Sequence, residues 1–106
     1  KLIRDLIAQR MRAEGLGDHL RKLEGEELLK ASKHKVAEEM QELLDAPPER
    51  LAREIGDALH AITNLMKVAG ISPEEVADVQ AQRATKDGLF DDGIYLDDVT
   101  LTKRDH

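Results

Sequence analysis

The sequence contains no cysteine and no tryptophan, and only one Phe and one Tyr. The absence of cysteine excludes a disulfide framework, a thiolate metal site and a cysteine nucleophile. The scarcity of aromatic residues means that any core is built from Leu, Ile, Val, Ala and Met. Basic residues are also in the minority: 16 Lys and Arg face 22 Asp and Glu, a formal net charge of -6. That balance argues against a nucleic-acid-binding surface, which is normally basic.

Long apolar runs are absent as well. None approaches the roughly 18 residues of a membrane span, and no signal-peptide pattern is recognisable. We therefore expect a soluble, cytoplasmic protein that does not act at a membrane. With 106 residues, of which 41% are hydrophobic, the chain is long enough and apolar enough to fold as one domain.

Apolar residues spaced three, four or seven apart predict helices along most of the chain. The first expected helix covers residues 1–14 and stops at a Gly-Leu-Gly break over residues 15–17. A second helix is expected from about residue 26 to residue 46. The Pro-Pro pair at 47–48 ends it, because a residue that precedes proline is forced out of the helical region.

The third expected helix has the strongest apolar pattern in the chain. It begins at Pro48, where the missing N–H of proline costs nothing, and Gly70 closes it. Its apolar stripe consists of Leu51, Ile55, Ala58, Leu59, Ile62, Leu65 and Met66. A fourth helix opens with a Ser-Pro-Glu-Glu capping box at residues 72–75 and reaches about Lys86, with Gly88 as its C-terminal cap.

The helical pattern disappears in the last part of the chain. Phe90 and residues 94–96 favour an extended arm, and a short strand is expected over residues 99–102. The predicted architecture is a single all-α domain over residues 1–106, in which about 88 residues form an antiparallel four-helix bundle and the remainder a tail. Because thin helices of this length bury limited area, we expect a homodimer or a homotetramer.

Two neighbouring helices of this bundle carry clustered acids. Residues three or four apart share a helix face, so Glu39 projects with Glu42, and Glu54 with Asp57. Glu39 and Glu54 lie directly beside the apolar stripes, and antiparallel packing through those stripes brings the acids together along one edge. Such carboxylates repel one another unless they protonate or bind a cation, and their oxygens suit Mg²⁺ or Mn²⁺ better than Zn²⁺. A solvated acidic face is the alternative.

The same acids stand in a recognisable order. Glu38-Glu39-x-x-Glu42, eleven residues, then Glu54-x-x-Asp57 resembles the signature of the all-α nucleoside triphosphate pyrophosphohydrolases. These are the MazG-like enzymes, related to dimeric dUTPases and to phosphoribosyl-ATP pyrophosphohydrolase. Flanking segments are similar too: Lys-Leu-Ile-Arg-Asp at 1–5, Lys-Val-Ala-Glu-Glu at 35–39, and Lys-Asp-Gly-Leu-Phe with Gly-Ile-Tyr-Leu over 86–96. The likeness thus spans most of the chain.

The resemblance implies a Mg²⁺-dependent enzyme, with Mn²⁺ as a substitute. It makes Glu39, Glu42, Glu54 and Asp57 the principal metal ligands and Glu38 and Glu39 the catalytic acids. Glu38 would orient or deprotonate the attacking water, or bind a further ion. The implied reaction splits a nucleoside triphosphate into a monophosphate and pyrophosphate, as in house-cleaning of the nucleotide pool. The alternatives are phosphoribosyl-ATP hydrolysis in histidine synthesis and a non-catalytic helical interaction module.

Candidate substrate contacts lie outside the acids. Lys86 matches a lysine of the family and Arg83 lies one turn before it, so both are candidates for phosphate oxygens; the alternative is a favourable interaction with the helix C-terminus. Asn64 is a candidate contact to a base or sugar, or else a surface residue. For Lys35 we expect an intrahelical ion pair. His60 lies away from the acid edge, and we assign no role to it or to the other histidines.

Overall fold

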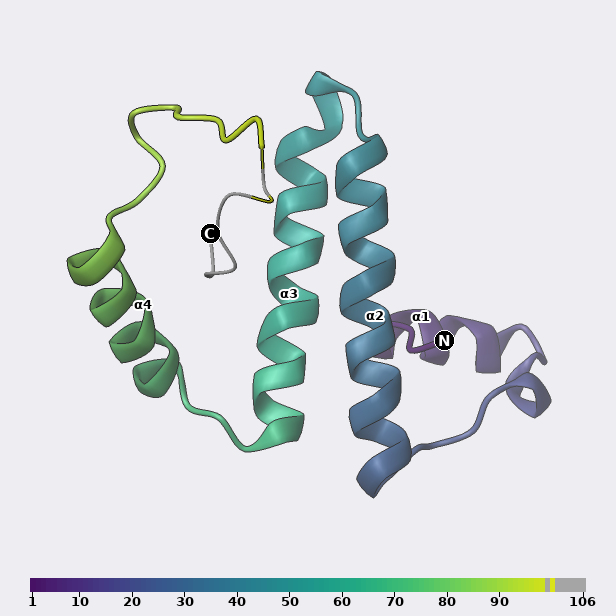
Figure 1. Ribbon diagram of the computed structural model, residues 1–106. Helices are drawn as coiled ribbons and strands as arrows, with labels where there is room; N and C mark the ends of the chain where they lie inside the picture. Colours follow the sequence, from purple (N-terminus) through teal and green to yellow (C-terminus); the bar gives the residue numbers. More distant parts are fainter. Residues whose placement is uncertain (99, 101–106) are drawn as a thin grey trace. The chain divides into compact units, whose positions relative to one another are not determined.

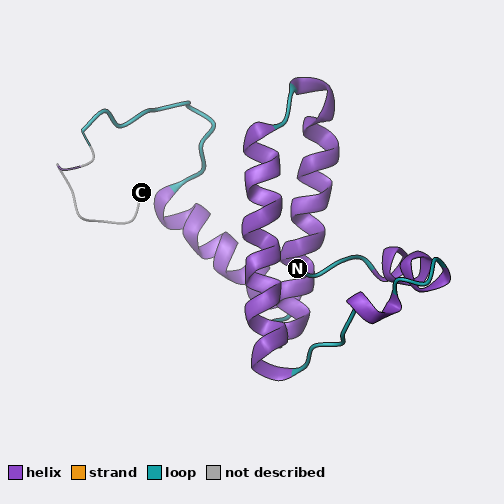
Figure 2. Cartoon of the chain, turned by 90° about the vertical axis from the view of Figure 1, so that its right-hand side faces the viewer, coloured by secondary structure: helices purple, strands orange, loops and turns teal. Residues whose placement is uncertain are grey.

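The computed structural model describes residues 1–98 and residue 100 (Figure 1). Within this range the chain contains four α-helices and no strand, which confirms the all-α prediction (Figure 2). It divides into two compact units, Lys1–Pro73 and Glu74–His106, and each is described by itself. The single domain and the bundle arrangement stay predictions. None of the described helices combines the length and the apolar character that crossing a bilayer requires.

The first helix is shorter than the sequence pattern predicts. α1 spans Asp5–Ala13, and the expectation of a helix from the first residue is wrong. Arg4 is extended, with φ -67° and ψ 147°, and its side chain is held by an acid of a later helix. Leu2 and Ile3, expected on the helix face, belong to this extended segment and are half-buried. α1 ends just before Gly15, whose φ of +80° lies in the left-handed region that favours glycine.

The first unit is built around a hairpin of two long helices. α2 covers Gly25–Asp45 and α3 covers Leu51–Ala69, and they lie side by side and antiparallel (Figures 1 and 2). Ala46 and Pro47 are extended, with ψ of 132° and 161°, so the Pro-Pro pair ends α2 as predicted. Pro48 does not open α3 itself but a short 3-10 turn over Pro48–Arg50.

Few side chains are fully buried, and their identity corrects the predicted core. The buried side chains among the described residues are Ser32, Glu39, Glu54, Ala58 and Ala61. Leu51, Ile55 and Leu59 of the predicted stripe are 43%, 44% and 57% exposed. Ala58 of the predicted stripe is buried, and Ile62, Leu65 and Met66 are half-buried. The buried face of α3 therefore departs from the predicted stripe only in part, toward Glu54 and Ala61. The small side chains of the two alanines allow α2 and α3 to approach closely, which places Glu54 inside the seam.

The second unit begins at Glu74 and contains α4, which spans Pro73–Asp87, except for its first residue, together with the tail that follows. Gly88 ends α4 as predicted, with φ +80° and its N–H bonded to a carbonyl one turn back. A turn follows in which the N–H of Gly93 donates to the carbonyl of Phe90, at 3.2 Å. No strand occurs in the part of the tail that is described, and the strand expected over 99–102 lies mostly outside it.

Candidate metal site

Three glutamates from two helices form a cluster that we call the Glu trio: Glu39 and Glu42 on α2 and Glu54 on α3. One carboxylate oxygen of each lies within 4.8 Å of the others. Glu39 and Glu42 share a face because they are three residues apart on one helix. Glu54 joins them because α3 runs antiparallel beside α2. The structure thus brings together three of the four metal ligands expected from the sequence.

Burial distinguishes the trio from an ordinary acidic surface. Glu39 and Glu54 are only 8% and 7% exposed. Among the described residues, one oxygen of each carboxylate, Oε2, is buried and has no hydrogen-bond partner. A buried carboxylate oxygen without a partner costs folding free energy, because the water it loses is not replaced. A cation bound between α2 and α3 would satisfy both oxygens.

Electrostatic repulsion within the Glu trio affects the pKa of Glu42, its exposed member. The pKa of Glu42 is raised above its ordinary value of 4.5, first by the neighbouring Glu39 carboxylate, and then by burial and by Glu54. The negative charge of the trio is therefore not fully neutralised by the residues around it. Like charges in close proximity shift a pKa in this direction.

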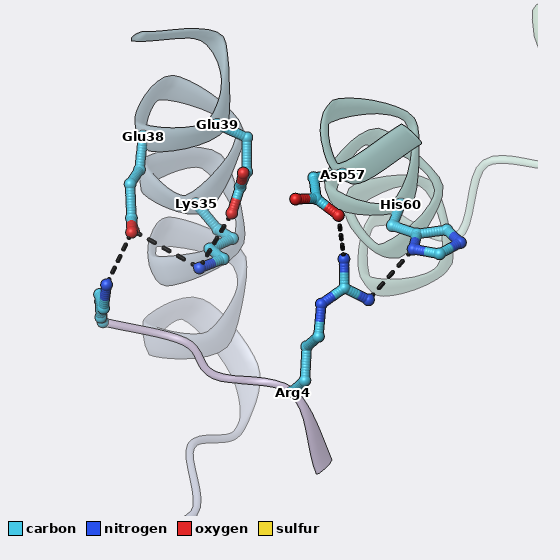
Figure 3. A network of polar contacts seen from close by, with 7 residues as sticks. Arg4, Lys35, Glu38, Glu39, Asp57 and His60 are labelled. Carbon is cyan, nitrogen blue, oxygen red and sulfur yellow. Dashed lines mark hydrogen bonds and ion pairs between the residues drawn. The ribbon is translucent and has the colours of Figure 1, made fainter. Parts of the chain in front are cut away.

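Asp57, the fourth expected ligand, lies outside the trio. Its Oδ1 accepts a hydrogen bond from Arg4 Nη2 at 2.9 Å, and Arg4 Nη1 lies 3.1 Å from Nδ1 of His60 (Figure 3). Asp57 and Glu39 face one another from opposite helices in this view. A ligand role for Asp57 would place a metal ion beside the carboxylate that Arg4 holds by Oδ1.

Glu38, the second candidate catalytic acid, is held by two cations. Lys1 Nζ lies 2.8 Å from Glu38 Oε1, and Lys35 Nζ lies 3.6 Å from Oε2. Lys35 also lies 3.2 Å from Glu39 Oε1, which confirms the predicted intrahelical pairing. The hydrogen bond from Lys1 is the main reason that the pKa of Glu38 is lowered, against the opposing effect of burial. Glu38 is accordingly a carboxylate at neutral pH.

The local charges do not balance. The five acids are Glu38, Glu39, Glu42, Glu54 and Asp57, and the cations bound to them are Lys1, Arg4 and Lys35. Five negative and three positive charges leave an excess of two negative charges. Glu42 and Glu54 form no ion pair within the described part of the chain. Oxygen donors with this excess charge fit a divalent cation such as Mg²⁺ or Mn²⁺.

A cavity of about 610 Å³ opens beside these residues. Glu39 and Lys35 line it from α2, and Asp57 and His60 line it from α3. The N-terminal segment closes the opposite side with apolar side chains and with Arg4. The cavity thus combines an apolar wall with charged groups of both signs, as small-molecule sites commonly do.

The expected substrate contacts belong to two different units of the chain. Asn64 also lines the cavity, and its Nδ2 donates to the buried Ser32 Oγ at 3.1 Å. It is thus neither a plain surface residue nor a free donor. Arg83 forms an ion pair with Asp87 at 2.9 Å, one turn along α4. Arg83 and Lys86 belong to the second unit, and their contact with a substrate stays a prediction.

Sequence reasoning missed two functional candidates and gave a third no role. The sequence identifies Lys1 and Arg4 only as part of the segment 1–5 that resembles the family, and it predicts no contact for either residue. His60 was given no role, and the structure places its Nδ1 3.1 Å from Arg4 Nη1. The feature of the sequence that could have indicated them is the pair of cations itself, Lys1 and Arg4, three residues apart. Their partners are more than 30 residues away, so only tertiary structure reveals them.

Comparison with known proteins identifies no relative of this chain. No protein-family model matches the chain, and neither a curated protein nor a solved structure matches it. Membership of the pyrophosphohydrolase superfamily therefore stays a prediction that rests on the motifs.

Proposed function

We propose that the chain is a Mg²⁺-dependent nucleoside triphosphate pyrophosphohydrolase. One observation carries the metal part of this proposal: two buried, unpartnered carboxylate oxygens, on Glu39 and Glu54, lie in a trio of acids. The nucleotide part is supported by the resemblance of the motifs. A merely solvated acidic face is disfavoured, because two members of the trio are more than nine-tenths buried.

Glu39, Glu42 and Glu54 would hold the ion, and Asp57 would join them if it released Arg4. When bound, a divalent ion supplies charge neutralisation for phosphate oxygens and acidifies a nearby water. The trio alone would repel a triphosphate, so the residues need the ion for substrate binding as well as for chemistry. Their oxygen-only chemistry favours Mg²⁺ or Mn²⁺.

The remaining roles fall to residues around the trio. Glu38, kept ionised by Lys1, would accept a hydrogen bond from the attacking water and orient it. Lys35 limits the negative charge at Glu38 and Glu39 from the same helix. The net reaction adds water across the anhydride between the α- and β-phosphates and yields a monophosphate and pyrophosphate. Phosphoribosyl-ATP contains the same anhydride and is the alternative substrate.

The test is a pyrophosphate-release screen over canonical, deoxy- and modified nucleotides and phosphoribosyl-ATP, in Mg²⁺. We expect release from at least one of them, and loss of release in Glu39→Gln and Glu54→Gln. Glu49→Gln removes an exposed acid outside the trio and serves as the matched control. Equal activity of wild type and the trio variants would reject the mechanism. Inactivity on every nucleotide would favour the non-catalytic interaction module.

We also propose that the chain associates with a second copy through α3. Leu51, Ile55 and Leu59 recur every four residues and remain substantially exposed, so they form one apolar ridge. The buried core of the hairpin contains two glutamates and only two apolar side chains among the described residues. A helix pair with so small an apolar core gains stability by burying such a ridge against a copy of itself.

A further inference from the structure

The four residues before α1 connect the two helices of the hairpin. Lys1 binds Glu38 on α2 at 2.8 Å, and Arg4 binds Asp57 on α3 at 2.9 Å. In Figure 3 this segment leads to Arg4, whose side chain extends toward Asp57 and His60. Residues 1–4 thus bind acids of both helices through cationic side chains: Lys1 contacts α2 and Arg4 contacts α3.

Arg4 lies between the Asp57 carboxylate and the cavity. Its guanidinium holds Asp57 by one nitrogen and contacts His60 by another, and Arg4 also lines the cavity of about 610 Å³. The side chain remains 54% exposed and that of Asp57 30% exposed. An ion pair this accessible contributes little net stability, so a stronger cation can displace it at small cost.

We propose that a divalent ion displaces Arg4 from Asp57, and that the released guanidinium then binds an anionic group of phosphate type in the cavity. This inference rests on the proposed metal site. The trio provides the independent sign of a ligand, because its two nine-tenths buried carboxylates each keep an unpartnered oxygen. Arg4 accordingly neutralises the Asp57 carboxylate in the metal-free protein, and the metal ion takes its place.

Coulomb's law gives the reason for the exchange. A divalent ion near Asp57 attracts the carboxylate twice as strongly as Arg4 does, and it repels the guanidinium. The freed guanidinium presents planar, paired N–H donors, which match two oxygens of a phosphate group. By linkage, the metal and the anion favour each other, whereas the metal and Arg4 compete.

Lys35 is a less suitable candidate for release. It pairs with Glu39 at 3.2 Å, but it also keeps Glu38 at 3.6 Å, so it retains a carboxylate if a metal takes Glu39. Its side chain is only 20% exposed, against 54% for Arg4. The Arg4 side chain has no second carboxylate partner in the described part of the chain, and its other contact is with the imidazole of His60.

The first experiment titrates Mn²⁺ alone by calorimetry into wild type, Arg4→Ala and Arg53→Ala. Arg53 is an exposed arginine of α3 that does not line the cavity, so it controls for the loss of one positive charge. We expect Arg4→Ala to bind Mn²⁺ about fivefold more tightly than wild type, the equivalent of ~1 kcal/mol. Arg53→Ala should change the affinity by less than about twofold, because Arg53 is exposed and binds none of the five acids, so solvent and salt screen its charge. Unchanged or weaker binding by Arg4→Ala would overturn the displacement.

The second experiment measures binding of inorganic phosphate without any metal. Asp57→Asn frees Arg4 permanently, so this variant should bind phosphate more tightly than wild type, and the double variant Asp57→Asn/Arg4→Ala should lose the gain. Because no metal is present, direct contact between metal and phosphate cannot produce the effect. Equal phosphate binding by wild type and Asp57→Asn would refute the anion role of Arg4.

The two experiments also separate this inference from the proposed metal site. If wild type binds no divalent ion, the metal site is wrong and the displacement falls with it. If wild type binds Mn²⁺ but Arg4→Ala binds it no more tightly, the metal site stands and only the displacement is wrong.

Discussion

Glu39 on α2 and Glu54 on α3 bury one carboxylate oxygen each, and neither oxygen finds a hydrogen-bond partner in the described residues. The two residues lie on facing helices, within a cluster completed by Glu42. Packed interiors rarely leave such groups unsatisfied. The arrangement of these two oxygens therefore lowers the stability of the metal-free hairpin, and a bound cation would restore it.

Divalent metal should stabilise the fold. A ligand that binds only the native state raises the melting temperature, so millimolar Mg²⁺ or Mn²⁺ should shift the thermal transition of wild type upward. Glu54→Gln should lose the shift, whereas Glu49→Gln, outside the trio, should keep it. A wild-type transition that does not respond to either metal would contradict the site.

The same substitution should have the opposite effect in chelator. Glu54→Gln removes a buried negative charge, and its amide can donate to a neighbouring carboxylate, so the metal-free variant should gain about 1–2 kcal/mol of unfolding free energy. Urea denaturation in EDTA measures this gain, with Glu49→Gln again as the control. A loss of stability in EDTA would mean that Glu54 is needed by the fold itself.

The pH dependence of stability should reveal Glu42. Its pKa is raised in the folded state above the ordinary 4.5, so between those two values the folded protein binds more protons than the unfolded chain. The corresponding stabilisation is present below about pH 4.5, and it is lost as the pH rises through the folded-state pKa. Melting curves of wild type and Glu42→Gln, recorded in EDTA at several pH values, isolate this contribution. Parallel curves for the two proteins would show that Glu42 does not titrate in this way.

The hydrogen bond between Asn64 and Ser32 should act as a structural clamp between α3 and α2. Ser32 is fully buried and accepts from Asn64 at 3.1 Å. Ser32→Ala and Asn64→Ala should each cost about 1 kcal/mol, and the double variant should cost less than their sum because both remove one interaction. Strict additivity in urea denaturation would argue against the bond and would return Asn64 to the role of a substrate contact.

Self-association should depend on the exposed ridge of α3. Wild type should sediment above the 11.9 kDa of one chain, and Leu59→Glu should shift it toward the monomer because it buries a charge in the interface. Leu44→Glu, at an exposed leucine of α2 that is not on the ridge, provides the control. A wild-type monomer at high protein concentration, or dissociation by Leu44→Glu instead, would rule out this interface.

The sequence by itself determined the helices and most of their ends. The Pro-Pro pair and the glycines Gly15, Gly70 and Gly88 specify where helices stop through local backbone geometry, and Gly70 and Gly88 adopt the left-handed conformation expected of such caps. The spacing of Glu39 and Glu42 likewise placed both on one face of α2. These features depend on neighbours within a few residues, which is why a linear pattern predicts them.

Only the tertiary structure decided how α3 is turned and which cations meet the acids. The apolar stripe favoured Ile55 and Leu59 as core, yet Ala61 and the acid Glu54 are buried and these two residues are not. Close approach of two helices selects small side chains at the seam, and periodicity does not reveal that choice. The contacts of Arg4 with Asp57 and His60 join residues more than 50 positions apart. Such pairings arise from the path of the chain in space, because an exposed arginine is equally compatible with many acidic partners until folding brings one beside it.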